Sequence, residues 1–121
     1  FKDWSELPAA YAEADILCVP SRHDGWALVV PEGLAAGLPV VGTDRTGAAL
    51  ELISDWDNGW LVQAGSVDAL AVALRSAAMI PREHLAQMAG TALEVAARHS
   101  LTSGADRFLQ AADESISGWK S

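Results

Sequence analysis

Three short apolar runs, each followed by a helical segment, are the feature that most constrains the fold of this chain. The runs cover residues 16–19, 39–43 and 60–62. Each is short and bounded by turn-forming residues, as expected of strands buried in a sheet. Strands that alternate with helices favour a parallel sheet with right-handed crossovers. The sequence therefore predicts an α/β fold in which helices flank a parallel sheet.

Helical signals fill the rest of the chain. Apolar spacing predicts a helix over residues 4–14, and a helix over 28–36 accommodates Pro31 in its first turn and ends at Gly37. Further helices are expected over 48–53, over 67–79 with Ser66 as the N-cap, over 81–98, and from Ser100 or Ser103 to about residue 116. Everything after residue 37 is expected to pack as scaffold behind the loop that follows the first strand, with a helical C-terminal tail whose last residues, 117–121, fray. Phe1 and Lys2 are too short a segment to classify, with the frayed end of a strand as one interpretation. Cys18 is interpreted as a small buried hydrophobe in a core strand.

Composition excludes several classes of function. The net charge is −8 and the eight basic residues are scattered, which argues against nucleic acid or an anionic membrane surface as a partner. The single cysteine excludes an internal disulfide and a cysteine-based metal site, and it is compatible with a reducing cytosol. No apolar run approaches the roughly 20 residues of a membrane span. Because the chain begins at Phe1 with a strand edge left to pair, we expect residues 1–121 to be one partial domain.

The loop over residues 21–27 is the first place to look for chemistry. Ligands of open parallel sheets bind at the carboxyl ends of the strands, where this loop joins the first strand to a helix. The loop contains Gly25, and the Leu28 and Val29 amides would face outward at the helix N-terminus, an arrangement that suits a phosphate or diphosphate. It matches neither the Walker nor the dinucleotide-binding glycine pattern, so a plain strand-to-helix turn is the alternative.

Several segments in order resemble the donor-binding domain of GT-B glycosyltransferases, and most of all the retaining family called group 1 or family 4. The resemblance covers nearly the whole chain. The segments are Tyr11 to Ser21, Asp24-Gly25-Trp26, Glu32 to Val41 and Asn58 to Val62. The family signature is two glutamates separated by seven residues, and Asp24 and Glu32 hold these positions. The resemblance implies a Rossmann-like sheet as part of a GT-B fold.

The resemblance also implies roles for individual residues. Glu32 matches the glutamate that accepts hydrogen bonds from the ribose hydroxyls of a nucleotide-sugar, since a carboxylate can accept from both hydroxyls of a cis-diol. Asp24 matches the catalytic-site glutamate that contacts the transferred sugar. The remaining donor-binding positions act through their backbone: Gly25, Trp26 and Ala27 beside the sugar, Leu28 and Val29 at the diphosphate.

Two departures from the family pattern stand out. Asp24 is one methylene shorter than glutamate, and Ala27 replaces a common glycine. The arginine and lysine that the family places on the diphosphate would precede Phe1, and the acceptor domain is also outside this chain. Arg22 and Arg45 are candidate substitutes, with solvated loop arginines as the alternative. His23 and Glu51 are further candidates, against a plain exposed histidine and a helix-end glutamate.

The sequence therefore predicts part of a retaining hexosyltransferase that binds a nucleotide-diphosphate sugar as its donor substrate. We expect no metal and no cofactor, and an N-terminal acceptor domain as partner. We expect a cytoplasmic location, with membrane association of the whole protein left open, and no activity from these 121 residues alone. One alternative is a non-catalytic GT-B-like scaffold or interaction module, which the shorter Asp24 favours. A weaker alternative is an enzyme like the sugar-nucleotide epimerases.

Overall fold

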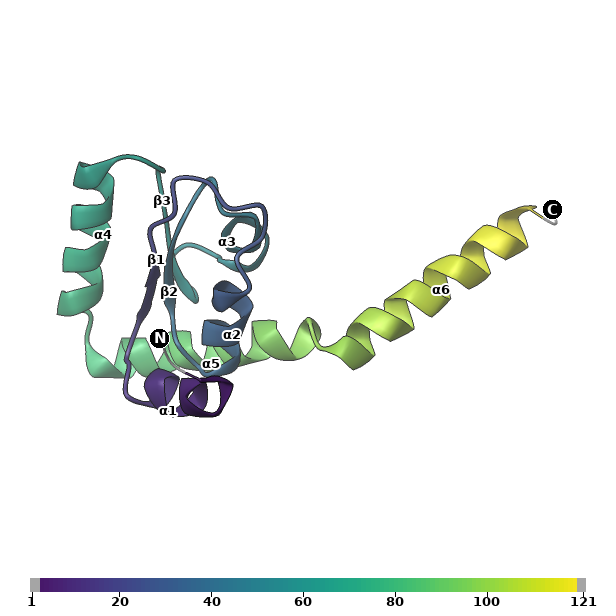
Figure 1. Ribbon diagram of the computed structural model, residues 1–121, viewed down its shortest axis with the longest axis horizontal. Helices are drawn as coiled ribbons and strands as arrows, with labels where there is room; N and C mark the ends of the chain where they lie inside the picture. Colours follow the sequence, from purple (N-terminus) through teal and green to yellow (C-terminus); the bar gives the residue numbers. More distant parts are fainter. Residues whose placement is uncertain (1–2, 120–121) are drawn as a thin grey trace.

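The computed structural model describes residues 3–119 and contains a three-stranded parallel sheet with helices on both faces (Figure 1). The elements in chain order are a 3₁₀ helix η1 (Trp4–Glu6), α1 (Leu7–Ala12), β1 (Leu17–Val19), α2 (Val29–Ala35), β2 (Val40–Thr43), α3 (Gly47–Leu52), β3 (Gly59–Val62), α4 (Val67–Met79), α5 (Arg82–Arg98) and α6 (Leu101–Trp119). The strand order is β1-β2-β3, and both pairings are parallel. The predicted fold class is confirmed.

Two apolar cores hold the sheet between its helices. On one face, α2 and α3 pack on the sheet through fully buried residues such as Val30, Leu34 and Ala49. On the other face, α4 covers β2 and β3 through Trp60, Ala73 and other buried residues. Helix α5 contributes to both cores and runs across the end of the sheet where the strands begin (Figure 1). The opposite end, where the strands finish, is thereby left to the loops.

Local signals mark the helix and turn boundaries correctly. Gly37 has a φ of 76°, and the amides of Gly37 and Leu38 donate to the carbonyls of Leu34 and Gly33, which closes α2 in a Schellman motif. The Asn58 side chain is buried and bonds to the Ser54 amide and the Leu52 carbonyl, so it fastens the predicted turn before β3. These residues lie close together in sequence, which is why the sequence predicts them.

Cys18 is exposed, and its predicted burial in a core strand is wrong. The side chain lies opposite Val41, on the face of the sheet that α4 covers. Helix α4 packs against β3, whereas β1 is the strand at the other edge. An apolar run buried on both faces is the rule for a central strand, and β1 is not central among the described strands.

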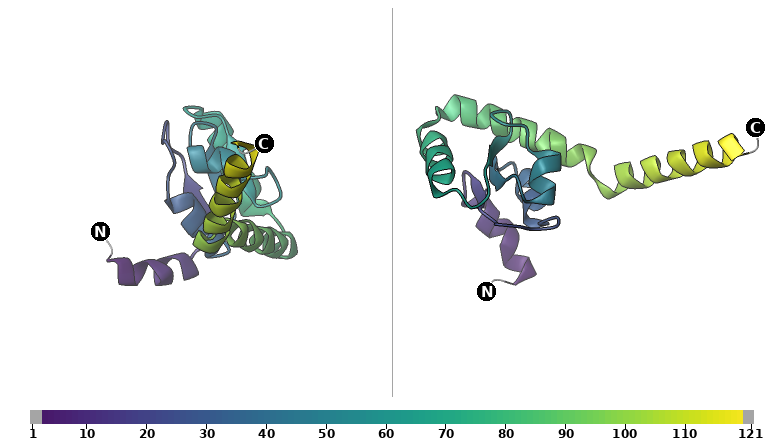
Figure 2. Two further views of the ribbon diagram at one scale, coloured as in Figure 1. Left: turned by 90° about the vertical axis from the view of Figure 1, so that its right-hand side faces the viewer. Right: turned by 90° about the horizontal axis from the view of Figure 1, so that it is seen from above.

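Helix α6 projects from the body as a free arm (Figures 1 and 2). None of its described residues is buried, although apolar side chains such as Phe108 and Leu109 recur along it. The expectation that all of the later chain packs as scaffold is therefore right for α4 and α5 and wrong for α6. The arm is helical to Trp119, three residues beyond the predicted end at residue 116. The expectations for residues 1–2 and 120–121 lie outside the described residues.

Candidate functional site

The loop over residues 21–27 is fastened to the neighbouring connection by backbone hydrogen bonds. The Asp24 amide donates to the Arg45 carbonyl at 3.0 Å. In return, the Gly47 and Ala48 amides at the start of α3 donate to the Asp24 and Trp26 carbonyls at 3.1 and 2.8 Å. The N-terminus of α3 therefore binds this loop, and the loop has a defined path over the carboxyl end of the sheet.

Gly47 is the glycine on which this packing depends. A Cβ atom at position 47 would overlap the Gly25 carbonyl oxygen, which belongs to backbone that cannot rotate away. Gly25 itself has open space where a Cβ atom would stand. The sequence pattern indicates Gly25 and not Gly47, because the close approach joins two segments far apart in the chain.

Two side chains tie the strand ends together beneath the loop. The Thr43 hydroxyl, at the end of β2, donates to the Ser21 carbonyl at 2.7 Å and lies 2.9 Å from the buried Thr46 hydroxyl. The Asp44 carboxylate accepts a hydrogen bond from the Ala64 amide at 2.8 Å. The connections after all three strands are thus linked to one another, which gives the site a rigid base.

Asp24, the first of the paired carboxylates, is half-buried and folds back onto its own loop. Its Oδ1 accepts a hydrogen bond from the Trp26 amide at 3.0 Å. This contact is an Asx-type turn, which the short side chain of aspartate favours. In this structure the Asp24 side chain therefore accepts the hydrogen bond of the Trp26 amide, which the family resemblance places beside the sugar.

Ala27 takes the left-handed backbone conformation, with a φ of 68°. This conformation costs an L-residue with a Cβ atom roughly 1–2 kcal/mol, and glycine adopts it without this cost. The departure from glycine at this position is therefore a source of backbone strain at the edge of the site. Ala27 directly precedes Leu28, the N-cap residue of α2, so the strained residue lies just before the start of this helix.

Helix α2 begins without a side-chain cap. Leu28 occupies the N-cap position and offers no side-chain acceptor. Among residues 3–119, the Leu28 and Val29 amides have no hydrogen-bond acceptor. Glu32 lies in the first turn of the same helix. The structure thus brings unpaired amides and a carboxylate together at the start of α2.

Glu32, the second of the paired carboxylates, has a partner that is not among the predicted site residues. The Tyr11 hydroxyl on α1 donates to Glu32 Oε2 at 2.8 Å, and both side chains are half-buried. Partial burial, this hydrogen bond and the negative charge of Glu32 raise the pKa of Tyr11 to about 12. An open groove of about 550 Å³ lies between α1 and α2, lined by Trp4, Leu7 and the Tyr11–Glu32 pair among others. No sequence signal near Glu32 indicates a tyrosine 21 positions earlier.

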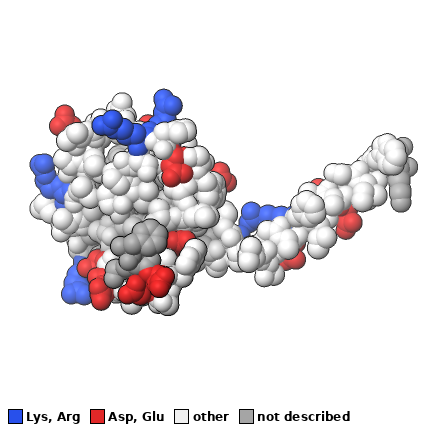
Figure 3. Space-filling model, in the orientation of Figure 1, with Lys and Arg blue, Asp and Glu red and all other residues white. Residues whose placement is uncertain are grey.

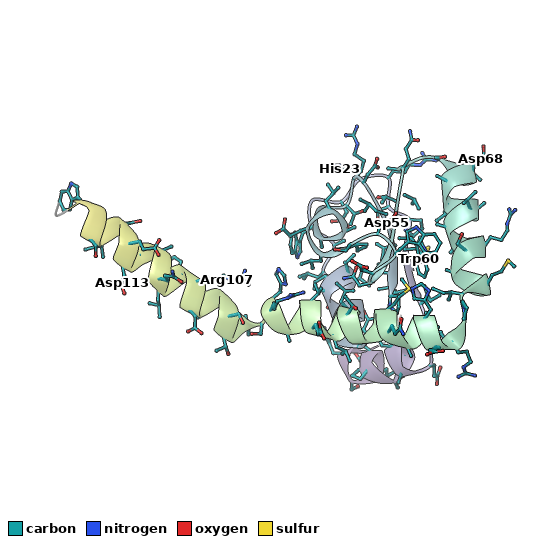
Figure 4. The ribbon with its side chains drawn as sticks, turned by 180° about the vertical axis from the view of Figure 1, so that it is seen from behind. His23, Asp55, Trp60, Asp68, Arg107 and Asp113 are labelled. Carbon is teal, nitrogen blue, oxygen red and sulfur yellow. The ribbon has the colours of Figure 1, made fainter. Side chains whose placement is uncertain are left out.

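The four secondary candidates are exposed, and none of them bonds to Glu32. Arg22 lines a small hollow of about 140 Å³ with Gln63 and Ser66, on the α4 side of the loop edge. The backbone carbonyl of Arg45 accepts the hydrogen bond from the Asp24 amide. Glu51 lies one turn along α3 from Gly47. His23 lies at the same end of the molecule as Asp68, the second residue of α4 (Figure 4).

Charge at this end of the body is mixed. Figure 3 shows basic side chains at the upper end, where the loops follow the strands, with acidic side chains close by. Within residues 3–119, no three His, Cys, Asp or Glu side chains gather as a protein metal site would require. The same residues include no helix that is both long and apolar enough to cross a membrane.

The chain is similar to known glycosyltransferases in sequence and in structure. A family model described as glycosyl transferases group 1 matches residues 1–94. The chain is 35% identical over 101 residues to the GDP-mannose-dependent α-(1-6)-phosphatidylinositol monomannoside mannosyltransferase of Mycolicibacterium smegmatis, a match that covers 78% of this chain and 25% of that protein.

Two solved structures share the fold. Sucrose-phosphate synthase from Thermosynechococcus elongatus superposes with a TM-score of 0.77 at 24% identity, over 97% of this chain and 29% of that one. Anabaena HepE, solved with UDP-glucose, gives a TM-score of 0.71 at 25% identity, over 81% of this chain and 26% of that one. This chain thus spans about a quarter of the length of these proteins. The family match and the shared architecture together show that the chain belongs to the group 1 glycosyltransferases and has part of the GT-B fold.

Proposed function

We propose that this chain supplies the binding site for a nucleotide-diphosphate sugar in a glycosyltransferase that transfers a hexose with retention at the anomeric carbon. The observation that carries the proposal is the position of Glu32 in a group 1 glycosyltransferase. Its carboxylate lies in the first turn of α2, directly after the fastened loop over residues 21–27. The UDP-glucose complex of the similar HepE supports a nucleotide-sugar as the ligand class.

The proposed division of roles follows the order of groups along the loop and α2. Glu32 accepts hydrogen bonds from the ribose hydroxyls, because an ionised carboxylate offers two oxygens to a diol. The unpaired Leu28 and Val29 amides donate to the diphosphate, whose negative charge increases as the sugar leaves. Asp24, Gly25, Trp26 and Ala27 lie along the path of the transferred sugar.

The test is a titration of UDP-glucose and GDP-mannose against the full-length protein by calorimetry. We expect binding of at least one of them, and a loss of about ten- to a hundredfold in affinity for Glu32→Ala, since hydrogen bonds to charged groups are the stronger ones. Glu94→Ala, an exposed glutamate on α5, is the matched control and should bind like the unaltered protein. Equal affinity in the Glu32 and Glu94 variants would overturn the role of Glu32. The anomeric configuration of the transfer product, read by nuclear magnetic resonance, tests retention.

A non-catalytic scaffold is the second candidate, and the conformation of Asp24 favours it. The carboxylate expected to contact the sugar is bonded to the Trp26 amide of its own loop. If the protein is a scaffold, it should transfer no sugar, and Asp24→Glu should not restore transfer. If it is an enzyme, transfer should be measurable in the unaltered protein, and Asp24→Glu should change its rate. A rate above background in the unaltered protein excludes the scaffold.

A further inference from the structure

Tyr11 is joined to the candidate site by one well-formed hydrogen bond. Its hydroxyl donates to Glu32 Oε2 at 2.8 Å, across 21 residues of sequence. Within residues 3–119, no other hydrogen bond links residues 3–14 to the rest of the body. The contact is therefore the polar attachment of α1, and it acts on the carboxylate to which we assign the ribose.

This hydrogen bond restricts a side chain that would otherwise be free. The Glu32 side chain has no other hydrogen-bond partner among the described residues. A free glutamate side chain loses rotamer entropy when a ligand fixes it. Because the hydrogen bond to Tyr11 already restricts the Glu32 side chain, less rotamer entropy is lost when the ligand binds. Groups that orient ligating side chains have the same effect in other sites.

The bond leaves the carboxylate able to bind a ligand. An ionised carboxylate has about four acceptor positions, and Tyr11 occupies one of them, on Oε2. Oε1 has no partner among residues 3–119. A phenol is a single donor that points its proton in one direction, so it fixes the plane of the carboxylate without neutralising it.

We propose that Tyr11 is a positioning residue, whose hydroxyl holds the Glu32 carboxylate in the orientation that accepts the ribose hydroxyls of the donor. This inference rests on the proposed function, because it assigns Glu32 to the ribose. Tyr11 acts through Glu32 and does not itself touch the reacting atoms. Removing the Tyr11 hydroxyl should therefore weaken the binding of a donor in proportion to the affinity that its ribose hydroxyls contribute.

The experiment compares ordinary nucleoside diphosphates with analogues that lack the ribose hydroxyls. Binding of UDP, GDP and their 2′,3′-dideoxy forms is measured by calorimetry in the full-length protein and in Tyr11→Phe, Glu32→Ala and the double variant. We expect Tyr11→Phe to weaken the binding of the preferred ribonucleotide about three- to tenfold. It should leave the dideoxy form unchanged, and it should add no loss in the Glu32→Ala background, where the acceptor of the Tyr11 hydroxyl is gone.

Leu7→Ala is the matched control, because Leu7 lines the same groove next to Tyr11 but has no hydroxyl. It should not change the ratio between ribonucleotide and dideoxynucleotide affinity. If Tyr11→Phe weakens both nucleotides equally, Tyr11 only holds α1 in place and the inference is wrong. If the unaltered protein binds UDP or GDP and Tyr11→Phe binds it equally well, the inference is also wrong while the proposed function stands. If the unaltered protein binds neither nucleotide, both are overturned.

Discussion

The chain makes two similar turns from a strand to a helix, after β1 and after β3, and caps only one of them with a side chain. At the start of α4, the Ser66 hydroxyl accepts a hydrogen bond from the Ala69 amide at 3.1 Å. At the start of α2, Leu28 provides no cap, and the first amides have no acceptor among the described residues. At α4 a side chain thus pairs one of the first amides of the helix, whereas at α2 no side chain does so, and the Leu28 and Val29 amides stay available to an external partner.

The two connections also differ in how they are held. The loop before α4 is short and is fixed by the Asp44 carboxylate on the Ala64 amide. The loop before α2 is longer, contains a strained Ala27 and depends on the backbone of α3 for its path. A helix that lacks its own cap thus requires neighbouring segments to position it, and the following variants test this difference.

The largest effect is expected for Gly47→Ala, because the new Cβ atom would overlap the Gly25 carbonyl oxygen. Moving the loop breaks the hydrogen bonds from α3, and we expect a loss of about 3 kcal/mol in the free energy of unfolding. Urea denaturation measures it. Gly90→Ala in α5 is the control, because nothing lies within 4 Å of its Cβ position. It should raise the stability by about 0.5–1 kcal/mol. Equal effects of the two substitutions would contradict the role given to Gly47.

Ser66→Ala should remove the cap of α4 and lower the free energy of unfolding by about 1 kcal/mol. Nucleotide affinity should not change, since the cap belongs to the connection that we do not assign to the donor. Ser100 caps α6 in the same way through the Ser103 amide. Because α6 buries none of its described residues, Ser100→Ala should reduce helical circular dichroism and leave the midpoint of unfolding of the body unchanged. A fall in nucleotide affinity for Ser66→Ala would show that the two connections are not separate.

Ala27→Gly should relieve the left-handed strain in the loop before α2. The gain of roughly 1–2 kcal/mol is partly cancelled by the greater freedom of glycine in the unfolded chain, so we expect a net rise of about 0.5 kcal/mol. Ala35→Gly, at an exposed helical position of α2, is the comparison and should lower the stability by about 1 kcal/mol. Thermal unfolding of both variants checks the opposite signs. The same sign in both would mean that the φ at position 27 is not strained.

The smallest effect is a dependence of stability on alkaline pH. The pKa of Tyr11 is raised from its ordinary value to about 12 in the folded protein. The folded state therefore keeps the phenol proton more tightly than the unfolded state does. The corresponding stability is fully present below about pH 10 and is lost as the pH rises towards about 12.

Tyr11 is the single tyrosine of the chain, so tyrosinate absorbance reports it directly. The titration midpoint should be near 12 in the folded protein and should return towards the ordinary value in Glu32→Gln. Tyr11→Phe should abolish this part of the alkaline loss of stability. An unshifted midpoint in the folded protein would contradict the contact with Glu32.

Much of the fold and part of the candidate site could be predicted from residues that are close in sequence. Gly37 as the helix end, Asn58-Gly59 as the turn and Ser66 as the cap act within a few residues, and the structure confirms each position. The uncapped start of α2 next to Glu32 is also a local pattern. The roles assigned to Asp24, Glu32 and the amides stay predictions until donor binding is measured.

Contacts between distant segments could not be predicted in this way. Cys18 is exposed because of its place at the sheet edge, and α6 is unburied because nothing among residues 3–119 covers its apolar side. The overlap that forbids a side chain at Gly47 joins it to Gly25, more than twenty positions earlier. Each of these features depends on which elements become neighbours, and periodicity carries no information on that.

The sequence by itself determined the elements, their alternation and the family of this chain, because hydrophobic spacing, caps and turn residues act over a few positions. Only the tertiary structure decided that Tyr11 holds Glu32 and that α3 positions the loop before α2. The physical reason is that a hydrogen bond requires a donor and an acceptor about 3 Å apart, and for Tyr11 and Glu32 that distance is set by the packing of two helices.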